Sequence, residues 1–175
     1  MKELLLRTLT GIALVVIVTG SIVLGPVSFS IVLLLVYFLG VRELYGLLEK
    51  RNLTNHWLRA IPGALFFPII YGIFQYKFSL FFLLLPPALW LLTALRGGIT
   101  LSGTLALLWL AIPLSSFFLL GWLDEEPGFQ FQIPLSVIAL IWINDTFAYL
   151  IGSLLGKHKM TPILSPGKTW EGFAG

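Results

Sequence analysis

The segment FQIPLSVIALIWINDTFAYLI, residues 131–151, is apolar along almost its whole length but carries one acidic side chain, Asp145. Its apolar residues occupy every face rather than alternating, which favours a helix over a strand. Its length matches the ~20 residues that a helix needs to cross the ~30 Å hydrocarbon core of a bilayer. The segment therefore predicts a membrane-spanning helix with a polar group inside it.

Five more apolar segments come before this one. They cover roughly residues 9–24, 27–48 (strictly apolar to 41), 58–74, 78–95 and 101–123. The chain is 58% hydrophobic and only 11% charged, whereas a soluble domain has about 25% charged residues. We therefore predict an all-α, polytopic membrane protein with about six transmembrane helices. The absence of cysteine excludes disulfides and thiolate chemistry.

The basic residues are distributed unevenly over the loops. Of the eleven Lys and Arg residues, only Lys77 lies in a loop on one side of the predicted membrane. The other ten lie at the amino terminus, between helices two and three, between helices four and five, or after helix six. The acidic residues 124–126 fall on the side that is poor in basic residues. Because basic loops stay in the cytoplasm, we predict a cytoplasmic amino terminus and a cytoplasmic segment after helix six.

We divide the chain into two parts at residue 143. Residues 1–143 hold helices one to five and the start of helix six, and residues 144–175 hold its end and a polar stretch. That stretch contains GKHK at 156–159 and SPGKTWEG at 165–172. Its small residues, hydroxyls and lysines suit the oxygens of a phosphate. It is not a P-loop, because Pro162 stands where the first glycine is needed, and the sequence predicts no strand before it. A helix is expected to begin near Pro166 or Lys168.

Asp145 is expensive to place in a membrane helix, at about 2.5–3.5 kcal/mol near mid-bilayer on insertion scales. At helical spacing it shares a face with Tyr149, Gly152 and Gly156, which predicts that it points into the helix bundle. One interpretation is a structural ion pair or hydrogen bond to another helix. The other is a metal or substrate site reached from the cytoplasm.

Together, the patterns D-T-x-A-Y, G-x-x-x-G-K-H-K and S-P-x-K-T-W-E-G resemble the CDP-diacylglycerol synthase family, also called phosphatidate cytidylyltransferases. The resemblance covers residues 144–175 in motif and the whole chain in layout. It implies a polytopic enzyme that makes CDP-diacylglycerol and pyrophosphate from CTP and phosphatidate, with Mg²⁺. It also implies an integral protein of a bacterial-type inner membrane, and the loop charges place its active face in the cytoplasm.

The resemblance suggests roles for six residues. Asp145 and Lys168 are the catalytic candidates, and Asp145 is also the candidate Mg²⁺ ligand. The candidates for substrate binding are Lys157, Ser165, Thr169 and Glu171. The partners implied are CTP, phosphatidate and the lipid bilayer, with no nucleic acid; the oligomeric state is left open, a homodimer being one option.

The family also has a further carboxy-terminal region with its own signature, rich in Lys, His-Gly-Gly and paired aspartates. Residues 144–175 are therefore expected to be the first part of a catalytic region that continues beyond Gly175 with the remaining metal ligands. Residues 1–175 alone are expected to be inactive.

Two other functions stay open on the sequence. A CTP-dependent lipid-alcohol kinase of similar architecture would release CDP instead of pyrophosphate. A non-enzymatic transporter or scaffold would use Asp145 as a coupling or structural acid. A transporter should have a second broken helix or intramembrane charge, and helices one to five offer only the Pro86-Pro87 break.

The charge asymmetry yields a test of topology. Single cysteines at Arg51, Lys168 and Glu125 are exposed to an impermeant thiol reagent in intact cells. We expect labelling at Glu125 alone, because the basic positions lie in the cytoplasm. Labelling at Arg51 without labelling at Glu125 would invert the predicted topology.

Overall fold

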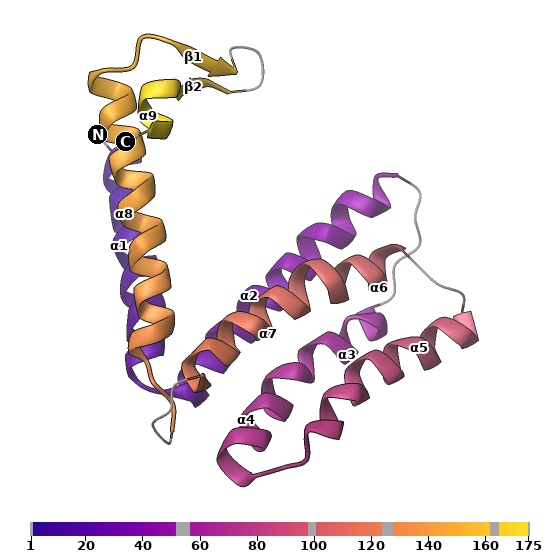
Figure 1. Cartoon of the computed structure of the whole chain (residues 1–175). Helices are drawn as coiled ribbons and strands as arrows, with labels where there is room; N and C mark the ends of the chain where they lie inside the picture. The colour runs from indigo at the N-terminus through magenta and orange to yellow at the C-terminus, as the bar shows by residue number, and fades with distance from the viewer. Residues whose placement is uncertain (1, 52–56, 98–100, 124–127, 162–164, 175) are drawn as a thin grey trace. The chain divides into compact units, whose positions relative to one another are not determined.

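The computed structural model describes residues 2–51, 57–97, 101–123, 128–161 and 165–174. The chain forms two compact units, Met1–Pro134 and Leu135–Gly175 (Figure 1). Residues 124–126, on which part of the charge argument rests, lie outside the described residues.

The described residues of the first unit are almost entirely helical. The elements are α1 (Lys2–Val23), α2 (Pro26–Glu49), the 3₁₀ turn η1 (Trp57–Arg59), α3 (Ile61–Ala64), α4 (Phe66–Tyr76), the 3₁₀ helix η2 (Leu80–Leu84), α5 (Leu85–Gly97), α6 (Leu101–Leu105), the π-helix η3 (Ala106–Ala111), α7 (Ile112–Leu119) and the 3₁₀ turn η4 (Leu120–Trp122). All five of the apolar segments predicted there are helical.

Four helical stretches among the described residues are long and apolar enough to cross a membrane. They are Pro26–Glu49, Trp57–Tyr76, Leu101–Trp122 and Gln132–Leu154. The other two predicted segments appear as shorter apolar helices, Thr8–Val23 and Leu80–Leu95. Large apolar side chains are exposed along these helices, for example Leu9, Leu35 and Trp109, as hydrocarbon surroundings allow. The all-α membrane fold is confirmed, and the number of spans stays a prediction.

Helix α2 supplies the centre of the first unit. Its buried residues recur every fourth position and so form a single face, which is the period expected of a packed helix; they are Phe29, Leu33, Tyr37, Val41 and Tyr45. This face packs against α4, the π-helix and α7, while α1 also lies against α2. Figure 1 shows α2 and α7 side by side.

A buried hydrogen bond ties α2 to the start of the third apolar segment. The Tyr37 hydroxyl, on a side chain that is completely buried, donates to the carbonyl of Ala60 at 2.7 Å. Gly63 makes this approach possible, because a Cβ there would collide with the Tyr37 hydroxyl and would lie 2.7 Å from Ala111 Cβ. A hydroxyl satisfied in this way lets a tyrosine occupy an apolar core.

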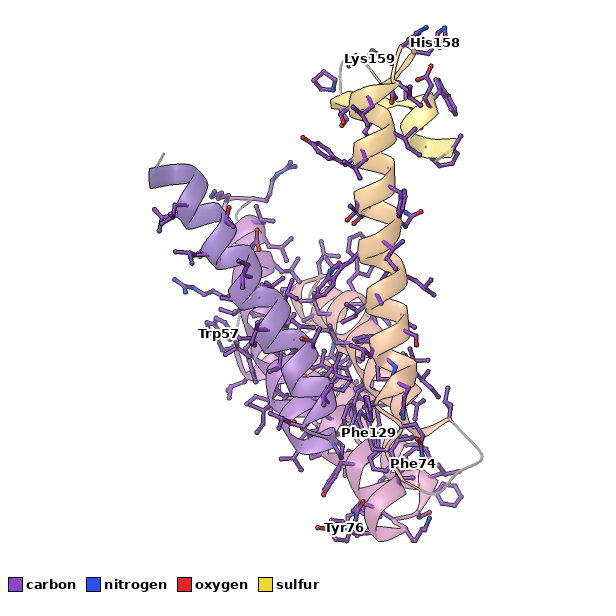
Figure 2. The ribbon with its side chains drawn as sticks, turned by 90° about the vertical axis from the view of Figure 1, so that its left-hand side faces the viewer. Trp57, Phe74, Tyr76, Phe129, His158 and Lys159 are labelled. Carbon is purple, nitrogen blue, oxygen red and sulfur yellow. The ribbon has the colours of Figure 1, made fainter. Side chains whose placement is uncertain are left out.

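The other end of α2 packs into a cluster of aromatic rings. Phe29 contacts Phe118 and Phe129 with ring centroids 5.8 and 6.1 Å apart. Trp122 stacks on Phe74 at 5.3 Å and meets Phe129 edge-on at 5.5 Å. Figure 2 shows Phe74 and Phe129 at the same end of the unit. The cluster holds the ends of the α2, α4 and α7 segments together.

The prolines coincide with changes of helix type. The π-helix Ala106–Ala111 comes directly before Pro113, whose ring nitrogen cannot donate to the turn before it. Pro86 and Pro87 lie in the first turn of α5, just after the 3₁₀ helix η2 ends. The expected break is therefore a change from 3₁₀ to α-helix at the start of α5.

The second unit contains the motif stretch. Helix α8 (Gln132–Leu154), which begins in the first unit, leads into a short antiparallel hairpin of β1 (Lys159–Thr161) and β2 (Ser165–Thr169), followed by α9 (Trp170–Ala174). The helix expected near Pro166 or Lys168 is present as α9, but it begins at Trp170, because Pro166 and Lys168 are in β2. Pro166 and Gly167 are poor helix formers. The segment that contains them pairs with β1 instead of forming a helix.

Candidate functional site

Three glycines let the hairpin and α9 approach α8 closely. A Cβ at Gly156 would lie 2.7 Å from both Oγ1 and Cγ2 of Thr169 and would collide with the carbonyl of Gly152. A Cβ at Gly172 would lie 2.6 Å from the carbonyl of Ala148 and 2.9 Å from Gly152 Cα. Small residues commonly allow such contacts between membrane helices. Here they seat the motif stretch on the last turns of α8.

Thr169 lies at the centre of this contact. It is 4% exposed, and its hydroxyl accepts a hydrogen bond from the Gly172 backbone N–H at 3.2 Å. A threonine just before a helix caps it in this way by satisfying one of the first free N–H groups. The sequence predicted a substrate contact for Thr169. The structure buries its side chain and gives the hydroxyl a backbone partner.

Glu171 joins α9 to the start of the hairpin. Its Oε1 lies 2.6 Å from His158 Nδ1, and both carboxylate oxygens lie 3.3 Å from the His158 backbone N–H. The Trp170 N–H donates to the His158 carbonyl at 3.0 Å. His158 is therefore linked to α9 through its backbone and its ring. We call this set of contacts the His158–Glu171 clasp.

The clasp affects the ionisation of Glu171. Hydrogen bonds from the His158 side chain and from backbone N–H groups lower the pKa of Glu171 from 4.5 to about 2. Because the folded-state pKa is depressed, the contact stabilises the fold above about pH 4.5, and this contribution is lost as the pH falls toward 2. The carboxylate is therefore ionised at neutral pH.

Three lysines project from this framework. The side chains of Lys157, Lys159 and Lys168 are all exposed, while Ser165 is half-buried. Lys159 pairs with Thr169 across the hairpin, and Lys168 comes one position before Thr169 in β2. Gly167 has open space where a side chain would be. The hairpin and the residue Lys157 before it thus present three cations and an unobstructed backbone beyond the end of α8.

Asp145 lies in α8, two turns before Gly152, and its side chain is exposed within its own unit. No hydrogen bond or ion pair joins it to another residue in the described ranges. Those ranges also contain no cluster of three His, Asp or Glu side chains that would hold a metal ion. Asp145 stays a candidate Mg²⁺ ligand.

Comparison with known proteins places this geometry in a family. A family model described as "Cytidylyltransferase family" matches residues 5–175. The chain belongs to this family. A phosphatidate cytidylyltransferase of Bacillus subtilis (strain 168) is 28% identical over the whole chain and 68% of its own length. Those of Staphylococcus aureus (strain COL) and Staphylococcus haemolyticus (strain JCSC1435) are each 56% identical over 36 residues, which is 21% of this chain and 14% of theirs. No solved structure matches.

Sequence reasoning missed His158. The sequence alone assigns it no role, and its partner, Glu171, is thirteen residues away. That separation fits no helical or strand period. Only the backbone pairing of the hairpin brings the two residues together.

The close contact between Gly156 and Thr169 predicts that a larger residue at position 156 destabilises the protein. Gly156→Ala should destabilise the protein by about 1–3 kcal/mol, as overpacking does, because its Cβ has no room against Thr169. Thermal unfolding in detergent measures the effect. Gly46→Ala, in open space on α2, is the matched control and should be neutral or stabilising by about 0.5–1 kcal/mol. Equal stability of the Gly156→Ala variant and the wild type would contradict the close contact.

Proposed function

We propose that the protein is a CTP:phosphatidate cytidylyltransferase that forms CDP-diacylglycerol and pyrophosphate in phospholipid synthesis. One observation carries the proposal. The exposed Lys168 of the hairpin and the exposed Lys157 just before it follow a helix long enough to span a membrane. Membership of the cytidylyltransferase family and the names of the relatives support it.

The chemistry of this reaction needs cations at the membrane surface. A phosphomonoester carries about −1.5 to −2 charges at neutral pH, and the phosphatidate phosphate must approach an anionic nucleotide. The phosphate is already a nucleophile, so its attack on the α-phosphorus of CTP needs positioning and charge neutralisation rather than a strong base. Lys168 and Lys157 supply the positive charge, and Ser165 is placed to donate to a phosphate oxygen.

The Mg²⁺ that the family resemblance implies belongs to this proposal. Mg²⁺ commonly binds through one or two carboxylates together with substrate phosphates, and Asp145 offers one such carboxylate. When bound, the ion neutralises phosphate charge and orients the two substrates. A cytoplasmic active face completes the proposal and rests on the distribution of basic residues.

Lys168 is the first residue to test. In the whole protein, Lys168→Ala should lower turnover of CTP and phosphatidate by about 10²–10³, the scale for losing one positioned electrostatic donor. Membrane insertion and thermal stability should not change, because the side chain is exposed. Production of CDP-diacylglycerol and pyrophosphate is measured with radiolabelled CTP. Lys159→Ala serves as the control with little effect.

An unchanged rate for a properly folded Lys168→Ala variant would remove this stretch from the active site. Release of CDP together with a phosphorylated lipid alcohol would instead identify a kinase.

Asp145→Asn separates the two roles open to Asp145. The substitution keeps size and hydrogen bonding but removes the charge. If Asp145 is a Mg²⁺ ligand, we expect the Asp145→Asn variant to need far more Mg²⁺ or to be inactive. Activity is measured across a Mg²⁺ titration, with thermal stability in parallel. An unaltered Mg²⁺ dependence with some loss of stability would make Asp145 a structural acid.

A further inference from the structure

We propose that His158 contacts a substrate phosphate through its Nε2 atom and that Glu171 is the positioning residue that holds the ring for this contact. The inference rests on the proposed function and deepens it. The phosphate belongs either to CTP or to phosphatidate, and the two sources are separated by the experiment.

The clasp fixes which ring nitrogen is available. An ionised carboxylate only accepts hydrogen bonds. Because Glu171 Oε1 lies 2.6 Å from Nδ1, the proton at this contact belongs to the histidine nitrogen. Nε2 is then the nitrogen left for another partner, and in the imidazolium form it carries a proton that it can donate to a phosphate oxygen. Carboxylates orient metal-binding histidines in the same way.

The His158 side chain is much more exposed than the Glu171 side chain that holds it. The side chain of His158 is 79% exposed, whereas that of Glu171 is 27% exposed. An exposed ion pair adds little to stability. The backbone already links His158 to α9 through the Trp170 N–H. What the ring contact adds is a defined direction for an accessible imidazole.

The surroundings of the ring suit an anion. His158 lies between Lys157 and Lys159, whose side chains are exposed, and Lys168 lies on the paired strand. Figure 2 shows His158 and Lys159 together at the outer end of their unit, beyond α8. The only carboxylate in hydrogen-bond contact with the ring, among the described residues, is that of Glu171. A phosphate drawn to the lysines would thus meet an oriented imidazole nitrogen.

Two substitutions distinguish a phosphate contact from a purely structural brace. In His158→Asn the amide nitrogen can take the place of Nδ1 and keep the bond to Glu171, but nothing replaces Nε2. In His158→Gln the longer amide can reach the position of Nε2, but the bond to Glu171 is lost. If His158 only braces the fold through its bond to Glu171, the His158→Asn variant should keep wild-type activity and the His158→Gln variant should not.

The test measures kcat and KM for CTP and for phosphatidate separately, with the whole protein in lipid nanodiscs. We expect His158→Asn to lower kcat/KM for one substrate by about ten- to a hundredfold, the range for a hydrogen bond to a charged group. Its thermal midpoint should stay at the wild-type value. The substrate whose KM rises identifies the source of the phosphate. Glu171→Ala removes the acceptor for Nδ1 and should lower the same kcat/KM, whereas Glu171→Gln, which keeps an acceptor, should recover most of that loss; equal kinetics of the Ala variant and the wild type would contradict the positioning role.

The matched control is Ser153→Ala, an exposed position on α8 whose hydroxyl donates to the Leu150 carbonyl of its own helix. It should leave all constants unchanged. Wild-type kinetics for His158→Asn would overturn the inference, whether or not His158→Gln is impaired. If Lys168→Ala abolishes turnover while His158→Asn does not, the inference fails and the proposed function stands.

A second measurement does not depend on turnover. The ring nitrogen NMR signals of His158 are assigned by their loss in the His158→Asn variant. Added pyrophosphate should shift the His158 Nε2 signal more than the Nδ1 signal. The absence of any His158 shift at pyrophosphate concentrations that perturb the Lys168 side chain would exclude the contact. If the wild-type protein does not convert CTP and phosphatidate, the proposed function fails, and this titration still decides the role of His158.

Discussion

A backbone polar group in hydrocarbon finds no water, so each spanning segment must satisfy its own N–H and C=O groups. The whole arrangement of this chain follows from that constraint. Even where Pro113 removes a donor, the Ile112 N–H bonds to the carbonyl of Leu107, and the ladder continues with a π-type spacing. Non-helical pairing of strands in the described residues begins only after α8 has ended at Leu154. The polar residues of the motif stretch are thereby placed at the end of a span.

At the end of α8, close backbone packing holds the motif stretch in position, as a large hydrophobic core would in a soluble domain. The motif stretch is too short to bury much surface of its own. Its position is set by Gly152, Gly156 and Gly172, which bring backbone to within van der Waals contact, and by Thr169, which fills the space between them and caps α9. A hairpin anchored in this way moves with α8. The backbone sets the positions of its lysines, whose exposed side chains make no ion pair with the other described residues.

The helices were predictable from sequence because apolar runs of spanning length have few alternatives. The ends of the helices were harder to predict. Helix α1 begins at Lys2 although the apolar run begins at residue 9, because the residues before the run include good helix formers that extend the helix. The hairpin could not be predicted. SPGKT has no alternation and contains Pro and Gly, and its pairing depends on β1, on His158 and on the glycines of α8. For the same reason the contact between His158 and Glu171 could not be read from the sequence.

Under the proposed function, the position of the hairpin at the end of α8 has a physical reason. The acyl chains of phosphatidate hold its phosphate at headgroup level, while CTP arrives from water. A site that joins them must offer positive charge at that one depth. Flexible lysines suit this task as mobile point charges, but they cannot fix an angle of attack. A ring held by a carboxylate can, because its donor direction is set before the substrate binds, and preorganised groups stabilise developing charge without having to rearrange. Lysines for attraction and an oriented imidazole for direction are then complementary parts of one phosphate site.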